Sequence, residues 1–239
     1  MGLASTMYAG DHGDQTVNIT TAMAGPFGIG GGYWLLSGGP ATWSGSQATA
    51  LANVQGCLRT NNLLFQYAPS PGVYHCPGDV RFNNPVGQGW AYDSYAVSAN
   101  VSSGGATPSA YAYSKLSQIK RSSDCLIMVE QADSRGFNVG SFIEEVTPPT
   151  PPPFTSPAKV TFVDVFATYH GNISTMAYAD GHAEFHKWTD PVILAAGKLA
   201  FQPGKNCFDY RSADISQQPS STGADYAWVI NHYLFPSNP

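Results

Sequence analysis

The stretch that most constrains the fold is Tyr169–Trp188, which reads YHGNISTMAYADGHAEFHKW. Two alternating segments flank Asp180-Gly181, a dipeptide that favours a two-residue type I′ turn with positive φ at both central positions. The stretch therefore predicts an antiparallel β-hairpin. Folding the flanks back on a two-residue turn pairs Met176 with Phe185.

That pairing assigns the side chains of the hairpin to two faces, because side chains alternate across a strand. One face would be apolar and buried: Met176, Tyr178, Ala183 and Phe185. The other would be mostly polar and solvated: Thr175, Ala177, Ala179, His182, Glu184 and His186. A shift of one residue in the pairing would mix the two sets.

Other stretches predict the elements that surround the hairpin. Cys125–Glu130 is a nearly continuous apolar run, which favours a buried strand, and Trp90–Val101 alternates as a strand does. Apolar spacing predicts helices within Ala48–Tyr67, Asp190–Ala200 and Asp225–Leu234. The chain should therefore combine helices with an antiparallel sheet.

Composition narrows the classes of function. Charged residues make up 11% of the 239 residues, well below the ~25% of an average soluble domain. The net charge is −5 and no Lys/Arg cluster occurs, which argues against a nucleic-acid partner. No apolar run reaches the ~18 residues of a membrane-spanning helix, and no signal-peptide or catalytic motif is recognisable.

The four cysteines are an even number in a loop-rich chain, which favours two disulfides and an oxidising compartment. Proximity in the sequence suggests the pairs Cys57–Cys76 and Cys125–Cys207. Free buried thiols are the alternative. Because no CxxC pair occurs, we do not expect a structural zinc site.

His182 and Glu184 are candidate ligands for a transition metal on the predicted polar face. His186 starts about 13 Å from His182 along the strand and cannot share an ion with it. The pair would need a further ligand, for which Asp164 and His170 are candidates. The alternative is a solvated polar strand.

Asp11 and Asp14 are the second candidate metal site. Together with backbone carbonyls, these two carboxylates could bind calcium, although they do not form an EF-hand pattern. Calcium or another divalent metal is the one type of cofactor that the sequence leaves open.

His170, nine residues and then Asp180-Gly181 resembles the His-x9-Asp-Gly signature of bacterial prepilin-type, pseudopilin-like proteins. Further segments also resemble that group: Gly2–His12 the end of its long N-terminal helix, Tyr74–Asp79 its Cys-Pro-x-Asp turn, and residues 94–100, 115–120 and 125–133 its sheet region.

The resemblance implies an α+β, pilin-like fold in which an N-terminal helix packs on an antiparallel sheet with long decorating loops. Residues 1–239 would then form one domain. Residues 1–12 would be the end of a longer helix whose hydrophobic upstream part is missing, 90–188 the sheet core, and 189–239 a C-terminal extension. His170 would begin the loop into the hairpin and bond locally.

The function implied by the resemblance is structural and non-enzymatic. The chain would be a subunit of a type IV pilus-like or type II secretion pseudopilus filament, with other copies of itself or other pilins as partners. It would lie outside the cell, or on the periplasmic side of the inner membrane before assembly, and would meet the membrane only through the missing helix. The alternatives are an extracellular module that binds carbohydrate or a surface ligand through exposed Trp and Tyr on its glycine-rich loops, and a metal-dependent enzyme.

Overall fold

A computed structural model describes residues 1–17, 45–101, 112–132, 141–142, 144–147, 159–162, 164–199, 202–203, 223–234 and 236. Within these ranges the α-helices are α1 (Gly2–Asp11), α2 (Gln47–Asn61), α3 (Pro191–Leu199) and α5 (Ala224–His232). Short 3-10 helices are η3 (Pro71–Tyr74), η4 (Val80–Asn83) and η6 (Leu116–Gln118). None of the described helices is both long enough and apolar enough to cross a membrane.

The main sheet has the strand order β3-β1-β2-β6-β7. Its strands are β1 (Tyr95–Ser98), β2 (Leu126–Glu130), β3 (Ser141–Phe142), β6 (Ile173–Tyr178) and β7 (Ala183–Lys187). All neighbouring pairs are antiparallel except β1 with β3. A separate antiparallel pair is formed by β4 (Glu144–Thr147) and β5 (Lys159–Phe162).

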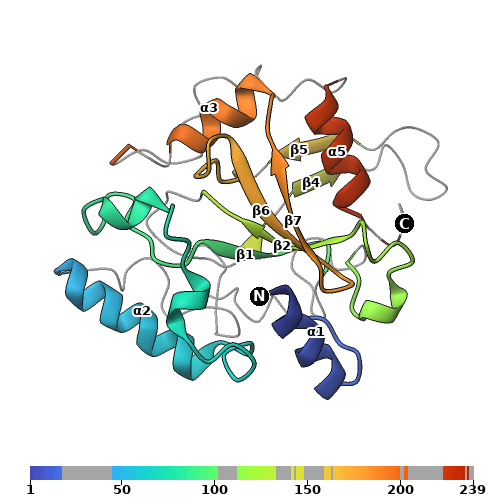
Figure 1. The fold of residues 1–239 in the computed structure, drawn as a ribbon, viewed down its shortest axis with the longest axis horizontal. Coiled ribbons are helices and arrows are strands. Elements are labelled where there is room, and N and C mark those ends of the chain that lie inside the picture. The colour runs from blue at the N-terminus through green and yellow to red at the C-terminus, as the bar shows by residue number, and fades with distance from the viewer. Residues whose placement is uncertain are drawn as a thin grey trace.

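Helices cover both faces of the main sheet, α1 and α2 on one side and α3 and α5 on the other (Figure 1). Each face has its own buried core. The first contains, among others, Ala4, Tyr8, Val54, Leu58, Val97, Ile127, Met128 and Ala177. The second contains, among others, Leu126, Val129, Met176, Tyr178, Trp188, Ile193, Tyr226 and Val229. The sheet is thus the middle layer of three.

This three-layer arrangement explains the apolar run that ends at Glu130. All five residues of β2 are buried, because β2 lies inside the sheet and is covered on both faces. The pairing of β2 with β6 shifts between Leu126 and Met128. The irregularity lets the neighbours Ile127 and Met128 join the same core, which strict alternation would forbid.

The expected α+β class is confirmed, and four antiparallel strands lie within the predicted segments. A helix overlaps each of the three ranges that apolar spacing indicated, and two of these helices begin one residue earlier than expected. The strand predicted over Trp90–Val101 is shorter, at Tyr95–Ser98, and β3, β4 and β5 were not predicted. The pilin-like architecture itself stays a prediction.

The predicted register of the hairpin is wrong by one residue. Met176 pairs with Glu184 and not with Phe185. The Gly181 N–H donates to the Tyr178 carbonyl at 2.9 Å, and Gly181 has a φ of +94°. Asp180 does not have positive φ. The loop is therefore three residues long, a tight turn followed by a left-handed glycine, and not a type I′ turn.

The shifted register changes which side chains are buried. Phe185, expected in the core, is 72% exposed, and it lies on the same sheet face as Ala177. His186, expected in solvent, packs on Trp228 of α5 with ring centroids 4.0 Å apart. Its Nε2 also lies 3.0 Å from an oxygen of Asp225. The shift thus mixes the two predicted sets, since His186 lies on the α5 side with Met176, whereas Phe185 lies on the α1 side with Ala177.

The register can be tested by two substitutions. Phe185→Ser should change the free energy of unfolding by less than about 0.5 kcal/mol, because the ring contributes little buried area. Met176→Ala should cost about 2–5 kcal/mol, because Met176 is 2% exposed in the core. Urea denaturation of both variants measures the difference. A larger loss of unfolding free energy for Phe185→Ser than for Met176→Ala would contradict the observed register and support the two-residue turn.

Candidate functional site

A thiol, a carboxylate and an imidazole meet at one end of the main sheet. Cys76 Sγ lies 3.1 Å from His170 Nε2, and the same nitrogen lies 3.2 Å from Glu130 Oε1. Within the described part of the chain, this is the one group of three or more His, Cys, Asp or Glu residues whose potential ligand atoms all lie within 4.8 Å. We call these residues the Cys76 cluster.

A tight turn positions the thiol. The Asp79 N–H donates to the Cys76 carbonyl at 2.9 Å, with Pro77 and Gly78 as the central residues. Proline favours the first central position of such a turn because its φ is fixed. The Gly78 N–H donates to Cys76 Sγ at 3.3 Å, and the Cys76 N–H donates to Ser94 Oγ at 2.9 Å. Cys76 is therefore held both at its sulfur and at its backbone N–H.

The carboxylate and the imidazole come from neighbouring strands. Glu130 is the last residue of β2 and is fully buried, and its Oε2 accepts the Thr175 N–H of β6 at 3.0 Å. His170 precedes β6, and its side chain is 42% exposed. A Cβ on Gly78 would lie 2.9 Å from His170 Cε1, so the absence of a side chain there makes room for the ring.

The environment of the thiol disfavours nucleophilic catalysis. Burial, and then the neighbouring Glu130 carboxylate, raise the pKa of Cys76 to about 12. The thiol is thus protonated at neutral pH, whereas the thiolate is the nucleophilic form. A single nitrogen of His170 also faces both partners, so the ring is not placed between a base and a nucleophile as in a catalytic triad.

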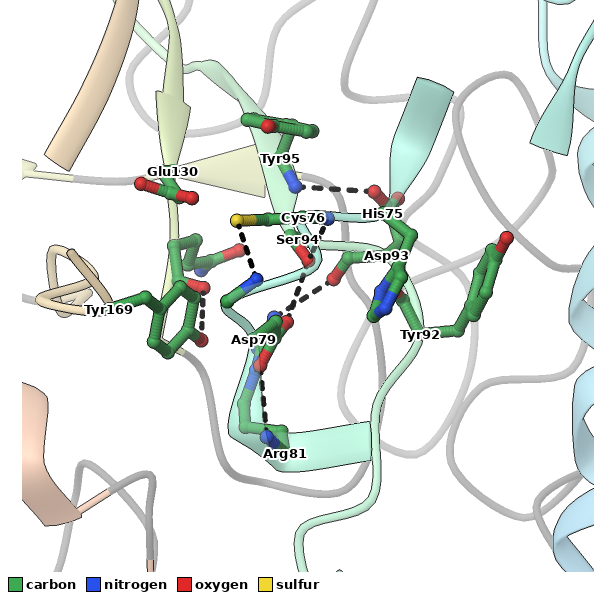
Figure 2. A network of polar contacts seen from close by, with 12 residues as sticks. His75, Cys76, Asp79, Arg81, Tyr92, Asp93, Ser94, Tyr95, Glu130 and Tyr169 are labelled. Atoms are coloured by element: carbon green, nitrogen blue, oxygen red, sulfur yellow. Dashed lines mark hydrogen bonds and ion pairs between the residues drawn. The ribbon is translucent and has the colours of Figure 1, made fainter. Parts of the chain in front are cut away.

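A buried ion pair supports the turn that carries Cys76. Arg81 donates to both oxygens of Asp79, at 2.9 and 2.6 Å, and to the Asp93 carbonyl at 2.9 Å. Ser94 Oγ donates to the second Asp79 oxygen at 2.7 Å (Figure 2). Both charged side chains are almost fully buried. These bonds connect the turn to the residues that lead into β1.

Removing the cation of this pair should destabilise the fold. Arg81→Met leaves the Asp79 carboxylate buried without its counter-charge, which should cost about 3–5 kcal/mol in free energy of unfolding. The matched control is Arg121→Met, because Arg121 pairs with Asp124 at the surface. That change should cost less than about 1 kcal/mol. Equal losses in urea denaturation would contradict a structural role for the buried pair.

Asp93 is a second buried carboxyl beside this pair. One of its oxygens accepts the Tyr95 N–H at 3.2 Å. Burial raises the pKa of Asp93 to about 8, although the Tyr95 bond and Arg81 act in the opposite direction. Between about pH 4 and about pH 8, Asp93 should therefore keep its proton in the folded chain. In the unfolded chain it releases that proton, because the usual pKa of an aspartate is about 3.9.

Asp93 should make stability depend on pH. Because its folded pKa exceeds the unfolded value, its contribution to the free energy of unfolding falls as pH rises from about 4 to about 8, by up to about 1.4 kcal/mol per pH unit. Asp93→Asn keeps an acceptor for Tyr95 and removes the titration. The stability of this variant relative to the natural chain should increase between pH 5 and pH 8 in urea denaturation. A constant difference would contradict the raised pKa.

The His-x9-Asp-Gly signature spans β6, with its parts at opposite ends. His170 belongs to the Cys76 cluster before the strand, whereas Asp180 and Gly181 form the hairpin turn after it. Asp180 Oδ1 accepts the His182 N–H at 3.1 Å. A Cβ on Gly181 would lie 3.4 Å from Thr6 Oγ1 of α1.

Among the residues that the structure describes, neither of the two predicted metal sites gathers a group of three ligands. His182 Nε2 lies 3.7 Å from Glu184 Oε1, and its Nδ1 lies 2.6 Å from Asp180. His170, which was suggested as a further ligand for this pair, belongs instead to the Cys76 cluster. Asp164, the other suggested ligand, is buried and is not a member of that cluster.

The calcium candidates have different partners. Asp11 accepts the hydroxyl of Tyr67 at 2.8 Å, whereas Asp14 accepts the backbone N–H of Ser117 at 3.1 Å. Each carboxylate thus connects the end of α1 to a separate segment.

The cysteine prediction needs a correction. Cys57, Cys76 and Cys125 are free thiols, so the predicted Cys57–Cys76 disulfide is not formed. Cys125 is buried among core residues, and its predicted partner Cys207 lies outside the described residues. Trp34 and Trp43 of the glycine-rich stretch also lie outside them.

Sequence reasoning did not find the Cys76 cluster. Its members are separated by 94 residues between Cys76 and His170 and by 40 between Glu130 and His170. A usable signal was present, because Glu130 ends an otherwise apolar strand. A carboxylate at such a position must find partners on folding.

Comparisons with known proteins leave the family open. A scan against protein-family models, a search of curated proteins and a search of solved structures each found no match to this chain.

Proposed function

We propose that the chain is a non-enzymatic structural subunit of a type IV pilus-like or type II secretion pseudopilus filament. In this proposal α1 is the end of a longer assembly helix, and its outer side packs against neighbouring subunits. The observation that carries the proposal is the group of large apolar side chains that stay exposed on the α1 side of the sheet.

Helix α1 has one buried face and one exposed apolar stripe. Ala4 and Tyr8 point into the core, whereas Leu3 and Met7 are 66% and 47% exposed. Residues four apart lie on the same side of a helix, so Leu3 and Met7 form a stripe that this chain does not cover. Phe185 is exposed on the same face of the sheet that α1 packs against. Exposed apolar surface of this kind favours contact with another protein.

The helix is also fixed to the globular part at both ends. A Cβ on Gly2 would lie 2.9 Å from Ala177 Cβ of β6, so the backbone of α1 approaches the sheet closely there. At the other end, Asp11 accepts the Tyr67 hydroxyl. Force or packing applied to α1 would therefore be transmitted to the sheet, as a filament subunit requires.

Two sequence resemblances add support. The His-x9-Asp-Gly signature and the end of α1 both resemble prepilin-type proteins. In this structure the Asp180-Gly181 end of the signature lies beside α1, because a Cβ on Gly181 would be 3.4 Å from Thr6 Oγ1. The location outside the cell and the pilin partners follow from the same proposal.

The proposal predicts that the protein is found in surface filaments. Antibodies against this chain should label filaments sheared from cells that produce it, seen by immunogold electron microscopy. Leu3→Glu and Met7→Glu should prevent incorporation, because a charge would be buried between subunits.

Val73→Glu is the matched control, because Val73 is also an exposed apolar residue but lies in η3. It should leave incorporation unchanged. Protein that is secreted entirely in dispersed form, or filaments that tolerate both α1 variants, would contradict the proposal.

A further inference from the structure

We infer that Cys76, Glu130 and His170 form a binding site for one thiophilic divalent transition metal, with zinc as the best-fitting ion. The site is independent of the proposed filament function.

The distances within the Cys76 cluster suit a single ion. In a tetrahedral zinc site with Zn–N and Zn–O bonds near 2.0 Å and a Zn–S bond near 2.3 Å, neighbouring ligand atoms lie about 3.3–3.6 Å apart. The observed separations are 3.1 Å between sulfur and imidazole nitrogen and 3.2 Å between that nitrogen and the carboxylate oxygen. The third separation, between the sulfur and the carboxylate oxygen, is within 4.8 Å, so small side-chain movements would bring the three atoms around one ion.

The surroundings orient each ligand atom toward the same point. The backbone N–H of Thr175 donates to Oε2 of Glu130, and the other carboxylate oxygen, Oε1, faces His170. The Gly78 N–H donates to the Cys76 sulfur and so stabilises a thiolate. Hydrogen bonds of this kind commonly hold and tune metal ligands.

The cluster concentrates three potential ligands on one buried carboxylate. His170 Nε2 carries at most one hydrogen, yet it faces both Cys76 Sγ and Glu130 Oε1 at bonding distance. The Cys76 thiol also bonds to Glu130, so three side chains share a few atoms around a fully buried carboxylate. A cation between the three atoms would bind all of them and compensate the buried carboxylate.

The types of donor atom select the metal. A thiolate sulfur with an imidazole nitrogen favours zinc and related transition metals, whereas calcium and magnesium prefer oxygen ligands alone. On binding, the Cys76 S–H bond breaks, its proton leaves to solvent and a metal–sulfur bond forms. The three protein ligands leave a fourth position, which a water can fill on the exposed side of His170.

Titration of the full chain with Co²⁺, a spectroscopic substitute for zinc, tests the inference. One equivalent should bind and give a sulfur-to-cobalt charge-transfer band, which Zn²⁺ should abolish by competition. Cys76→Ser should remove this band. His170→Asn should weaken binding more than about 100-fold, since even loss of a supporting contact costs about 10–100-fold.

Controls separate loss of the site from loss of the fold. His170→Asn is the decisive variant, because its partly exposed side chain can be replaced without opening the core. Its circular dichroism spectrum should match that of the natural chain, and zinc should raise the Tm of the natural chain only. Cys57→Ser and His182→Asn remove a thiol and an imidazole outside the cluster, and both should keep full binding. A missing charge-transfer band, or one that survives Cys76→Ser, would overturn the inference.

Discussion

The buried carboxylate of Glu130 is the constraint on which the rest of this structure depends. Glu130 ends the fully buried strand β2, where a charge is costly unless it is bonded. Its partners come from the β6 backbone at Thr175 and from His170 and Cys76, which are distant in the sequence. Satisfying one carboxylate therefore fixes the Cys76 turn and the start of β6 against the end of the sheet.

Strand β6 connects this cluster to the opposite end of the molecule. His170 lies in the cluster before β6, and the turn at Gly181 lies against α1 after it. The nine-residue spacing of the signature thus corresponds to the length of one strand with its two ends. The cluster and the apolar surface of α1 lie at opposite ends of the same strand, so the proposed metal site and the proposed assembly surface are separate.

The apolar pattern predicted much of this fold and less of the site. It located β2, the hairpin and α5. A strand buried on both faces has a continuous apolar run, and an element buried on one face has apolar residues at regular spacing. It gave the wrong register, because Asp180-Gly181 also fits a three-residue loop, and Phe185 was consequently placed in the core. The Cys57–Cys76 pairing relied on sequence spacing, whereas Cys76 meets its partners only through tertiary folding.

Zinc K-edge X-ray absorption spectroscopy of the zinc-loaded full chain tests the central claim most directly, because it reports the atoms bound to the metal. The Cys76 cluster predicts a four-coordinate shell with one sulfur at about 2.3 Å and nitrogen or oxygen ligands at about 2.0 Å. A shell of nitrogen and oxygen alone, or one with two or more sulfurs, would show that the metal binds elsewhere and that the three side chains do not form a common site.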